Sequence, residues 1–365
     1  MHASICAAAI ACALSFHSAH AQSGNKPGFV PGLRQEVAEP DEARSIAEIQ
    51  RRSIERLQRQ FPDGKRPVLR DAHPKAHGLV LAEFIVLDGL PEELRRGVFA
   101  KPSTYQALIR FSAGNVEVQP DTIPQAAGMA IKLLGVEGEK LLQRERNAKT
   151  QDFIMINAPV FFVSNLKEYV GVHEAMDEDR LLEFFQARPR LLQAIAIVRG
   201  QAINNPVQVR YWSMTPYLLG ERAVKFGAKP LSRVANEPPA ELGPDFKREV
   251  IIKQVSSEDV YYEFGIQLQA DPTSMPVEDP VVRWDEEVSP FQRVALIRIP
   301  KQDITSESWV RFGENLSFTP WHSIADHRPL GSNNRARLNI YEAISDFRHK
   351  MNGVVTQEPT SIPQR

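Results

Sequence analysis

The amino-acid sequence predicts one domain of the α+β class, and two kinds of periodicity support this prediction. Between Gly78 and Asn157, four short apolar runs with a period near two are separated by Pro, Gly and Asn, which is the pattern of β-strands joined by turns. The segments 41–61 and 166–203 repeat apolar residues with helical spacing instead. No internal repeat, low-complexity block or linker divides the chain, so we expect helices and strands to share one core.

The N-terminus is predicted to be a secretory signal peptide, residues 1–21. An Ala-rich apolar run from Ile5 to Phe16 is followed by a small-x-small cleavage signal that ends at Ala21. The run is too short for a permanent membrane anchor. We therefore expect a bacterial periplasmic or secreted protein cleaved after Ala21, and because Cys6 and Cys12 both lie in this segment, the mature chain would have no thiol.

The mature chain divides into three predicted parts. Residues 22–40 are polar with Gly and Pro and predict a flexible N-terminal arm, residues 41–353 form the domain, and residues 354–365 form a polar tail. Two later runs, VYYEFGIQLQ and RVALIRIP, predict further strands, and Pro189 is expected to break the second helical segment. The Pro-rich segment 204–244 has no pattern that assigns its elements.

Composition excludes two classes of protein. The chain has 365 residues, 42% of them hydrophobic and 24% charged, with a formal net charge of −1. A nearly neutral chain has no electrostatic basis for binding nucleic acid or an acidic membrane surface. A large core is expected, and the formation of a homo-oligomer is left open.

A predicted helix at residues 335–349, followed by a stop at Asn352-Gly353, carries unusual chemistry on one face. Arg337, Tyr341 and Arg348 stand at i, i+4 and i+11, so they fall within about 40° of one another around the helix. A phenol is thereby flanked by two guanidinium groups. On these residues alone, a solvated surface helix with a half-buried tyrosine is the simpler interpretation.

Three other positions are candidates on weaker grounds. His73 stands immediately before the first strong strand, Arg110-Phe111-Ser112 closes another strand, and Asn157 ends the DFIMIN strand before Pro159. A histidine near a strand end is more often structural than catalytic, and an Asn close to Pro is usually a turn residue. Each signal is weak by itself.

Taken together and in order, these segments resemble the haem catalases. The resemblance is carried by Arg70-x-x-His73-x-Lys75 (the distal histidine motif), Arg110-Phe111-Ser112 (R-F-S), Asn157-Ala158-Pro159-Val160-Phe161-Phe162 (N-T-P-V-F-F), Glu314-Asn315-Leu316-Ser317-Phe318-Thr319-Pro320 (E-Q-I-A-F-S-P) and Arg337-Leu338-Asn339-Ile340-Tyr341 (R-L-F-S-Y) with Arg348 beyond it. The chain ends soon after the last segment, so it resembles a minimal, periplasmic catalase-related peroxidase.

The resemblance implies an antiparallel eight-stranded β-barrel with flanking helices, an N-terminal arm and buried haem b. Tyr341 would be the axial iron ligand, and Arg337, one turn away, would stabilise its phenolate form. Arg70, Arg110 and Arg348 would pair with the haem propionates, since guanidinium groups bind carboxylates in forked geometry.

On the opposite side of the iron, the resemblance implies an acid-base pair. His73 would take a proton from bound peroxide and deliver it to the departing oxygen, while Asn157 would hydrogen-bond the same oxygens. Ser112 would orient His73, and Phe162 would line the pocket.

The activity implied is that of a haem peroxidase or catalase. It would reduce or disproportionate hydrogen peroxide, and reduce organic hydroperoxides with an unidentified electron donor, through a ferryl intermediate, protecting against peroxide stress. Rearrangement of fatty-acid hydroperoxides by a lyase or isomerase, and haem binding without turnover, remain as alternatives. The intact pair His73 and Asn157 argues against haem storage alone.

Three departures from the family pattern bear on the substrate. Gln125 replaces a carboxylate resembling one in the family's peroxide channel, and Asp71 and Ala72 replace two apolar residues before the distal histidine. These changes indicate a differently charged and wider approach to the haem, which favours bulky peroxides over rapid disproportionation.

Overall fold

The structure is a computed structural model that describes residues 32–231 and 237–363. The predicted signal peptide lies outside the described residues. Among the helices of the described part, none is long and apolar enough to span a membrane.

Nine strands form one antiparallel sheet, and eight of them close into a barrel. They are β1 (Ala76–Val86), β2 (Ser103–Ala113), β3 (Ala127–Leu134), β4 (Thr150–Ile156), β5 (Tyr211–Trp212), β6 (Tyr217–Leu219), β7 (Arg222–Pro230), β8 (Val260–Leu268) and β9 (Gln292–Ile299). Their order is β5-β4-β3-β2-β1-β9-β8-β7-β6, and a further β5–β7 pairing closes the ring and leaves β6 beside β7. The α+β prediction and the eight-stranded barrel implied by the resemblance are confirmed.

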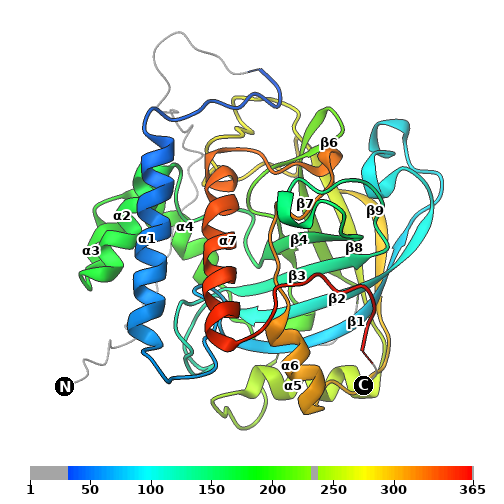
Figure 1. Ribbon diagram of the computed structural model, residues 1–365. Helices are drawn as coiled ribbons and strands as arrows, with labels where there is room; N and C mark the ends of the chain where they lie inside the picture. The colour runs from blue at the N-terminus through cyan, green and yellow to red at the C-terminus, as the bar shows by residue number, and fades with distance from the viewer. Residues whose placement is uncertain (1–31, 232–236, 364–365) are drawn as a thin grey trace. The chain divides into compact units, whose positions relative to one another are not determined.

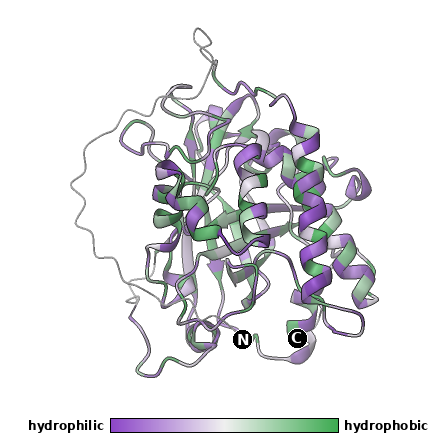
Figure 2. Cartoon of the chain, turned by 90° about the vertical axis from the view of Figure 1, so that its left-hand side faces the viewer, coloured by the Kyte–Doolittle hydropathy of each residue, from purple (hydrophilic) through white to green (hydrophobic). Residues whose placement is uncertain are grey.

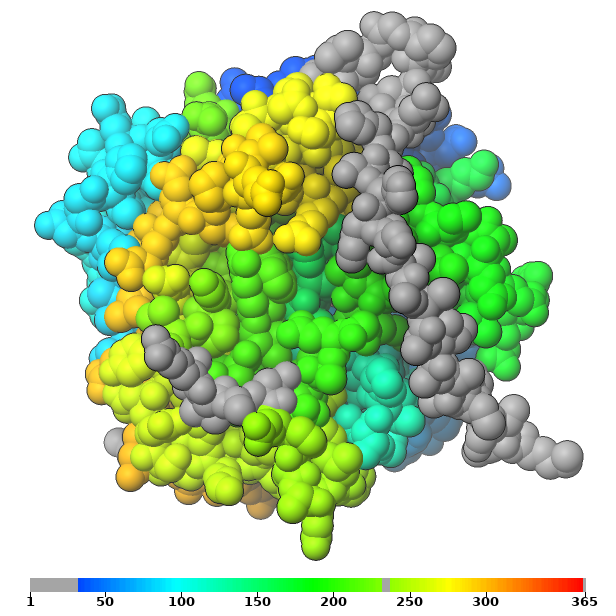
Figure 3. Space-filling view, turned by 180° about the vertical axis from the view of Figure 1, so that it is seen from behind, coloured from blue at the N-terminus to red at the C-terminus, as the bar shows by residue number. Residues whose placement is uncertain are grey.

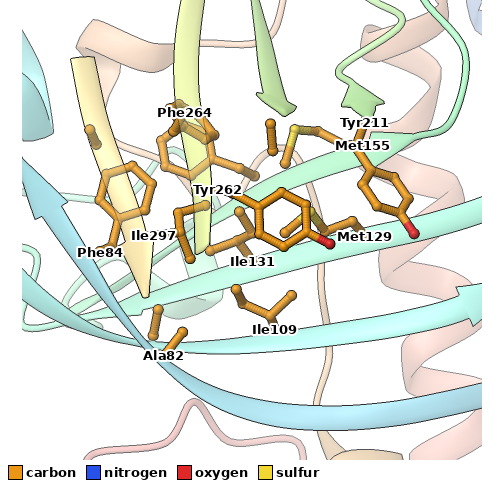
Figure 4. Packing of buried hydrophobic residues seen from close by; sticks show 14 of the residues in the cluster. Ala82, Phe84, Ile109, Met129, Ile131, Met155, Tyr211, Tyr262, Phe264 and Ile297 are labelled. Atoms are coloured by element: carbon orange, nitrogen blue, oxygen red, sulfur yellow. The ribbon is translucent and has the colours of Figure 1, made fainter. Parts of the chain in front are cut away.

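The barrel interior is packed with apolar side chains, among them Ile109, Met129 and Met155 (Figure 4). Aromatic rings meet at its centre: the centroids of Phe84 and Phe264 are 5.0 Å apart in an edge-on arrangement. Each fully buried Phe contributes roughly 1.5–3 kcal/mol through removal of apolar surface from water. Because strand side chains alternate between faces, the neighbours of these residues point outward, toward the helices.

Within the described residues, seven α-helices flank the barrel: α1 (Glu42–Gln60), α2 (Leu166–Asp177), α3 (Leu181–Gln186), α4 (Pro189–Arg199), α5 (Phe246–Ser257), α6 (Glu307–Asn315) and α7 (Ser332–Asn352). Helix α7 lies between α1 and the barrel, whereas α5 and α6 cover one end of it (Figure 1). The flanking helices carry hydrophilic and hydrophobic residues side by side, as one-sided burial requires (Figure 2). From behind, the chain from α5 to β9 covers much of the surface (yellow-green to orange in Figure 3).

Two sequence predictions need refinement. The segment 166–203 is three helices, and Pro189 is the first residue of α4, where its missing N–H costs nothing. The unassigned segment 204–244 holds β5, β6 and β7, and the first two are only two and three residues long. Strands this short have no measurable periodicity, which is why the pattern missed them.

The arm was predicted to be flexible, and its described part, residues 32–40, makes side-chain contacts with α7. Glu36 forms an ion pair with Arg335 in the first turn of α7 (Oε1 to Nη1, 2.8 Å). Glu42 and Glu278 form ion pairs with the same guanidinium group. Just before the helix, Gly331 has φ +87°, and an added Cβ would lie 2.7 Å from the carbonyl oxygen of Val277. Three carboxylates from distant segments thus fix the start of α7, and with it the direction of the helix.

Candidate functional site

A pocket lies between the outer face of β2, β3 and β4 and one face of α7. It leaves about 900 Å³ of space between protein atoms, counted out to the solvent. Its lining includes six of the predicted site residues: Arg70, His73, Arg110, Ser112, Tyr341 and Arg348. Residues that are separated by nearly 280 positions in the chain are therefore brought to one pocket.

Three arginines gather around one carboxylate at the pocket. Arg70 donates to Glu314 (Nη1 to Oε2, 2.9 Å) and to the carbonyl of Leu316 (2.7 Å), which also accepts from Arg348 at 3.0 Å. Arg110 Nη2 lies 3.7 Å from the other oxygen of Glu314. Three positive charges thus face one negative charge.

This cluster has more positive than negative charge and, among the described residues, a hydrogen-bond donor without a partner. Burial, together with the charge of Arg70, lowers the pKa of Arg110 and of Arg348 to about 9. The Nε of Arg110 is buried and has no hydrogen-bond partner. A ligand with two carboxylates would balance the charge and occupy free donors, so the residues present fit the propionates of haem.

His73 is positioned by its backbone and by two neighbours. Its φ of +58° is in the left-handed region, unusual for a residue other than Gly, and its carbonyl accepts from Arg110 Nη2 at 3.0 Å. Its Nδ1 lies 3.1 Å from Ser112 Oγ. At Gly128 an added Cβ would lie 2.5 Å from that Nδ1, so only glycine leaves room for the ring.

The environment of His73 favours the neutral imidazole. Burial, then the positive charges of Arg110, Arg337 and Arg70, lowers the pKa of His73 to about 3. With Nδ1 engaged by Ser112, the Nε2 atom is the nitrogen free to exchange a proton. The arrangement supplies a neutral base at the pocket wall.

Tyr341 lines the pocket from α7, and Arg337 holds its oxygen. The Nε and Nη2 of Arg337 donate to the phenol oxygen at 3.2 and 3.1 Å. Arg337 is only 2% exposed, and no carboxylate pairs with it in the described part of the chain. A forked, charge-assisted donor of this kind stabilises negative charge on the oxygen, as a metal-binding phenolate requires.

Asn157 and Phe162 are not brought to the pocket wall. The side chain of Asn157 accepts from the backbone N–H of Ala127 at 2.8 Å and donates to the carbonyl of Val198. Phe162 packs on Phe161, with ring centroids 4.3 Å apart. Their predicted roles toward peroxide and haem therefore stay predictions. Gln125 is also buried away from this wall, whereas Asp71 and Ala72 line it.

Sequence reasoning missed three contributors. Gly128 was not singled out, and Glu314 was named only as part of a motif, although three arginines predicted to meet at one site could have indicated a shared carboxylate partner. Asp71 forms a buried pair with Arg56 of α1 (Oδ1 to Nε, 2.9 Å), which ties the His73 loop to the helices. No local pattern marks Arg56, because the contact is made only in the fold.

No protein-family model matches the chain, and no curated protein matches it. Solved structures do. One is a fungal catalase (18% identity, TM-score 0.63, covering 81% of this chain and 62% of that one). Another is catalase A from Saccharomyces cerevisiae (18% identity, TM-score 0.63, 90% of this chain and 71% of that one).

The likeness establishes a catalase-like fold for this chain. The chain spans less than two thirds of the length of the first of these catalases. What either protein does is therefore not transferred by the comparison.

We predict that the ring of His73 stays neutral from pH 8 to about pH 4. Its folded pKa lies below the unfolded value near 6.5, so its contribution to stability is full above pH 6.5 and is lost as the pH falls toward 3. NMR titration of the imidazole measures this, and Arg110→Leu should move the midpoint upward. An ordinary midpoint near 6.5 in the wild type would contradict the description of the site.

Proposed function

We propose that the protein is a haem-dependent enzyme that degrades peroxide. The observation that supports this most directly is one pocket that presents a guanidinium-bound tyrosine, a neutral histidine and an excess of buried arginine. Haem bound there would supply the iron at which the O–O bond of a peroxide is split.

Each residue would have a distinct task around the cofactor. Tyr341 would ligate the iron as phenolate, with Arg337 holding the charge on its oxygen. Arg70, Arg110 and Arg348 would hold the two carboxylates. His73 Nε2 would accept the peroxide proton and return it to the departing oxygen, with Nδ1–H donating to Ser112 Oγ.

We also propose that organic hydroperoxides are substrates. Ala72 is exposed at the pocket wall, and Ala130, Ile154 and Ile344 add apolar surface to the same pocket. The charge of Asp71 is neutralised by Arg56. An organic hydroperoxide could place its chain here, and each methylene in contact would contribute up to about 0.8 kcal/mol. We further propose, on the sequence alone, that the enzyme works in the periplasm with an external electron donor.

The first test concerns the ligand. Tyr341→Phe removes the phenol oxygen, so we expect loss of haem or a changed spin state and visible spectrum. Tyr217→Phe is a matched control, because this buried tyrosine also lies near Arg337 but does not line the pocket. An unchanged spectrum in Tyr341→Phe would remove the central claim.

The second test concerns acid-base catalysis. His73→Ala should keep haem and slow the reaction with peroxide roughly 10²-fold or more, the usual effect of removing a general base. His73→Gln, which retains a hydrogen-bonding group without a base, should be equally slow. Stopped-flow mixing measures both rates, and wild-type rates would make His73 a structural residue.

The third test concerns the substrate. We expect organic hydroperoxides, or hydrogen peroxide with an added donor, to be used at least as well as hydrogen peroxide alone. Ala72→Leu fills the wall and should lower the rate with a bulky hydroperoxide more than the rate with hydrogen peroxide. The measurements are oxygen evolution from hydrogen peroxide, oxidation of the added donor, and consumption of an organic hydroperoxide. Rapid oxygen evolution with negligible donor oxidation and negligible hydroperoxide consumption would show disproportionation to be the main reaction.

A further inference from the structure

Beside the pocket, a second buried cluster joins the barrel to the tail of the chain. Lys132 of β3 is fully buried, and its ammonium lies 2.7 Å from Asp152 of β4 and 2.6 Å from Glu358. Glu358 belongs to the segment 354–363, after the last helix. The predicted polar tail therefore supplies one of the two anions that neutralise a buried lysine.

The cluster extends to His322, whose side chain is fully buried. Thr150 Oγ1 donates its single proton to Glu358 Oε2 at 2.6 Å, so it accepts from His322 Nε2 at 2.5 Å. His322 Nδ1 lies 2.7 Å from a carboxylate oxygen of Glu145. The ring of His322 therefore stands between Glu145 on one side and Thr150 with Glu358 on the other.

The result is a row of neighbouring polar side chains from Glu145 through His322, Glu358 and Lys132 to Asp152, with the ammonium of Lys132 between two carboxylates. Burial alone would lower the pKa of Lys132, but its two carboxylates raise it overall. Buried charges persist only when each has a counter-charge, and removing one partner is costly. Glu358 has the central position, since its Oε2 lies 2.6 Å from Lys132 Nζ and 3.4 Å from His322 Nε2.

Both ends of the row reach the lining of the pocket. Glu145 lines it directly. At the other end, Asp152 Oδ2 accepts from the backbone N–H of Thr319, and Asp152 donates its own N–H to the carbonyl of His322. Lys132 also lies 5.3 Å from the ring centroid of Phe318. Residues 317–322, here called the wall segment, include the pocket-lining Ser317, Phe318 and Thr319.

We propose that the C-terminal segment is a strap that holds the wall segment against β3 and β4, with Glu358 as the positioning residue that controls release of the cofactor. The inference rests on the proposed function, because it takes haem to be that cofactor. The strap binds the barrel through the ion-paired side chain of Glu358 and through Ile362, which packs against the core cluster. Its detachment would leave Lys132 and His322 with fewer anions and free the wall segment to move.

The test uses the full haem-loaded chain and two variants, Glu358→Gln and a truncation after Gly353. Haem transfer to an excess of apomyoglobin measures the dissociation rate, which we expect to rise at least roughly tenfold in both. Gln357→Ala, an exposed neighbour on the same segment, should release haem at the wild-type rate.

Two further variants separate positioning from general stability. Val260→Ala, in β8 and away from the wall segment, should lower Tm without changing haem release. Lys132→Met combined with Asp152→Asn and Glu358→Gln removes the buried cation together with both of its anions and should restore part of the retention lost in Glu358→Gln. Wild-type dissociation rates in Glu358→Gln and the truncated chain would overturn the strap, whatever happens to Tm.

If the wild type binds no haem, the proposed function fails, and the strap is then tested without it. Hydrogen exchange in the apoprotein reports on the Thr319 N–H, which donates to Asp152. Glu358→Gln should speed exchange in the wall segment several-fold and leave β8 unchanged. Unchanged exchange in the wall segment would overturn the strap independently.

Discussion

Three guanidinium groups share a single carboxylate at the centre of this structure, and that imbalance organises the pocket. Glu314 is itself mostly buried, which would raise its pKa, but the charges of Arg70, Arg110 and Arg348 lower the pKa overall. The same arginines hold the carbonyl groups of the His73 loop and of the chain after α6. The arginines that give the pocket its excess positive charge therefore also hold the backbone segments that shape the pocket.

The barrel makes this arrangement possible by separating two environments. Its interior is filled by aromatic and aliphatic side chains, so chemistry is confined to its outer face. There, alternate positions of β2 present Arg110 and Ser112, while the bare backbone at Gly128 admits the ring of His73. Helix α7 brings Tyr341 to the opposite wall, and its start is fixed by carboxylates that bind Arg335.

Much of this could be predicted from the sequence, and the reasons are local. Long strands and helices have measurable periods, so β1 to β4, α1 and α7 were expected close to their observed bounds. Tyr341, His73 and their neighbours were expected at one site because the motifs that contain them resemble those of the haem catalases in spacing and order. The strands β5 and β6, the partner of Arg335 in the arm and the Glu358 ion pair depend on contacts between distant segments, which leave no periodic signal.

The ion pairs that join Arg335 of α7 to carboxylates near the N-terminus constrain the order in which the molecule can fold. The first described residues of the chain bind its last helix, and the first strand pairs with the ninth. Such pairings close loops of more than 200 residues, and loop closure of this size slows folding. A growing chain cannot complete the barrel or seat α7 until nearly all of it has been synthesised. Partial chains therefore expose strand edges and apolar faces, and we expect them to need chaperones until the C-terminal residues arrive.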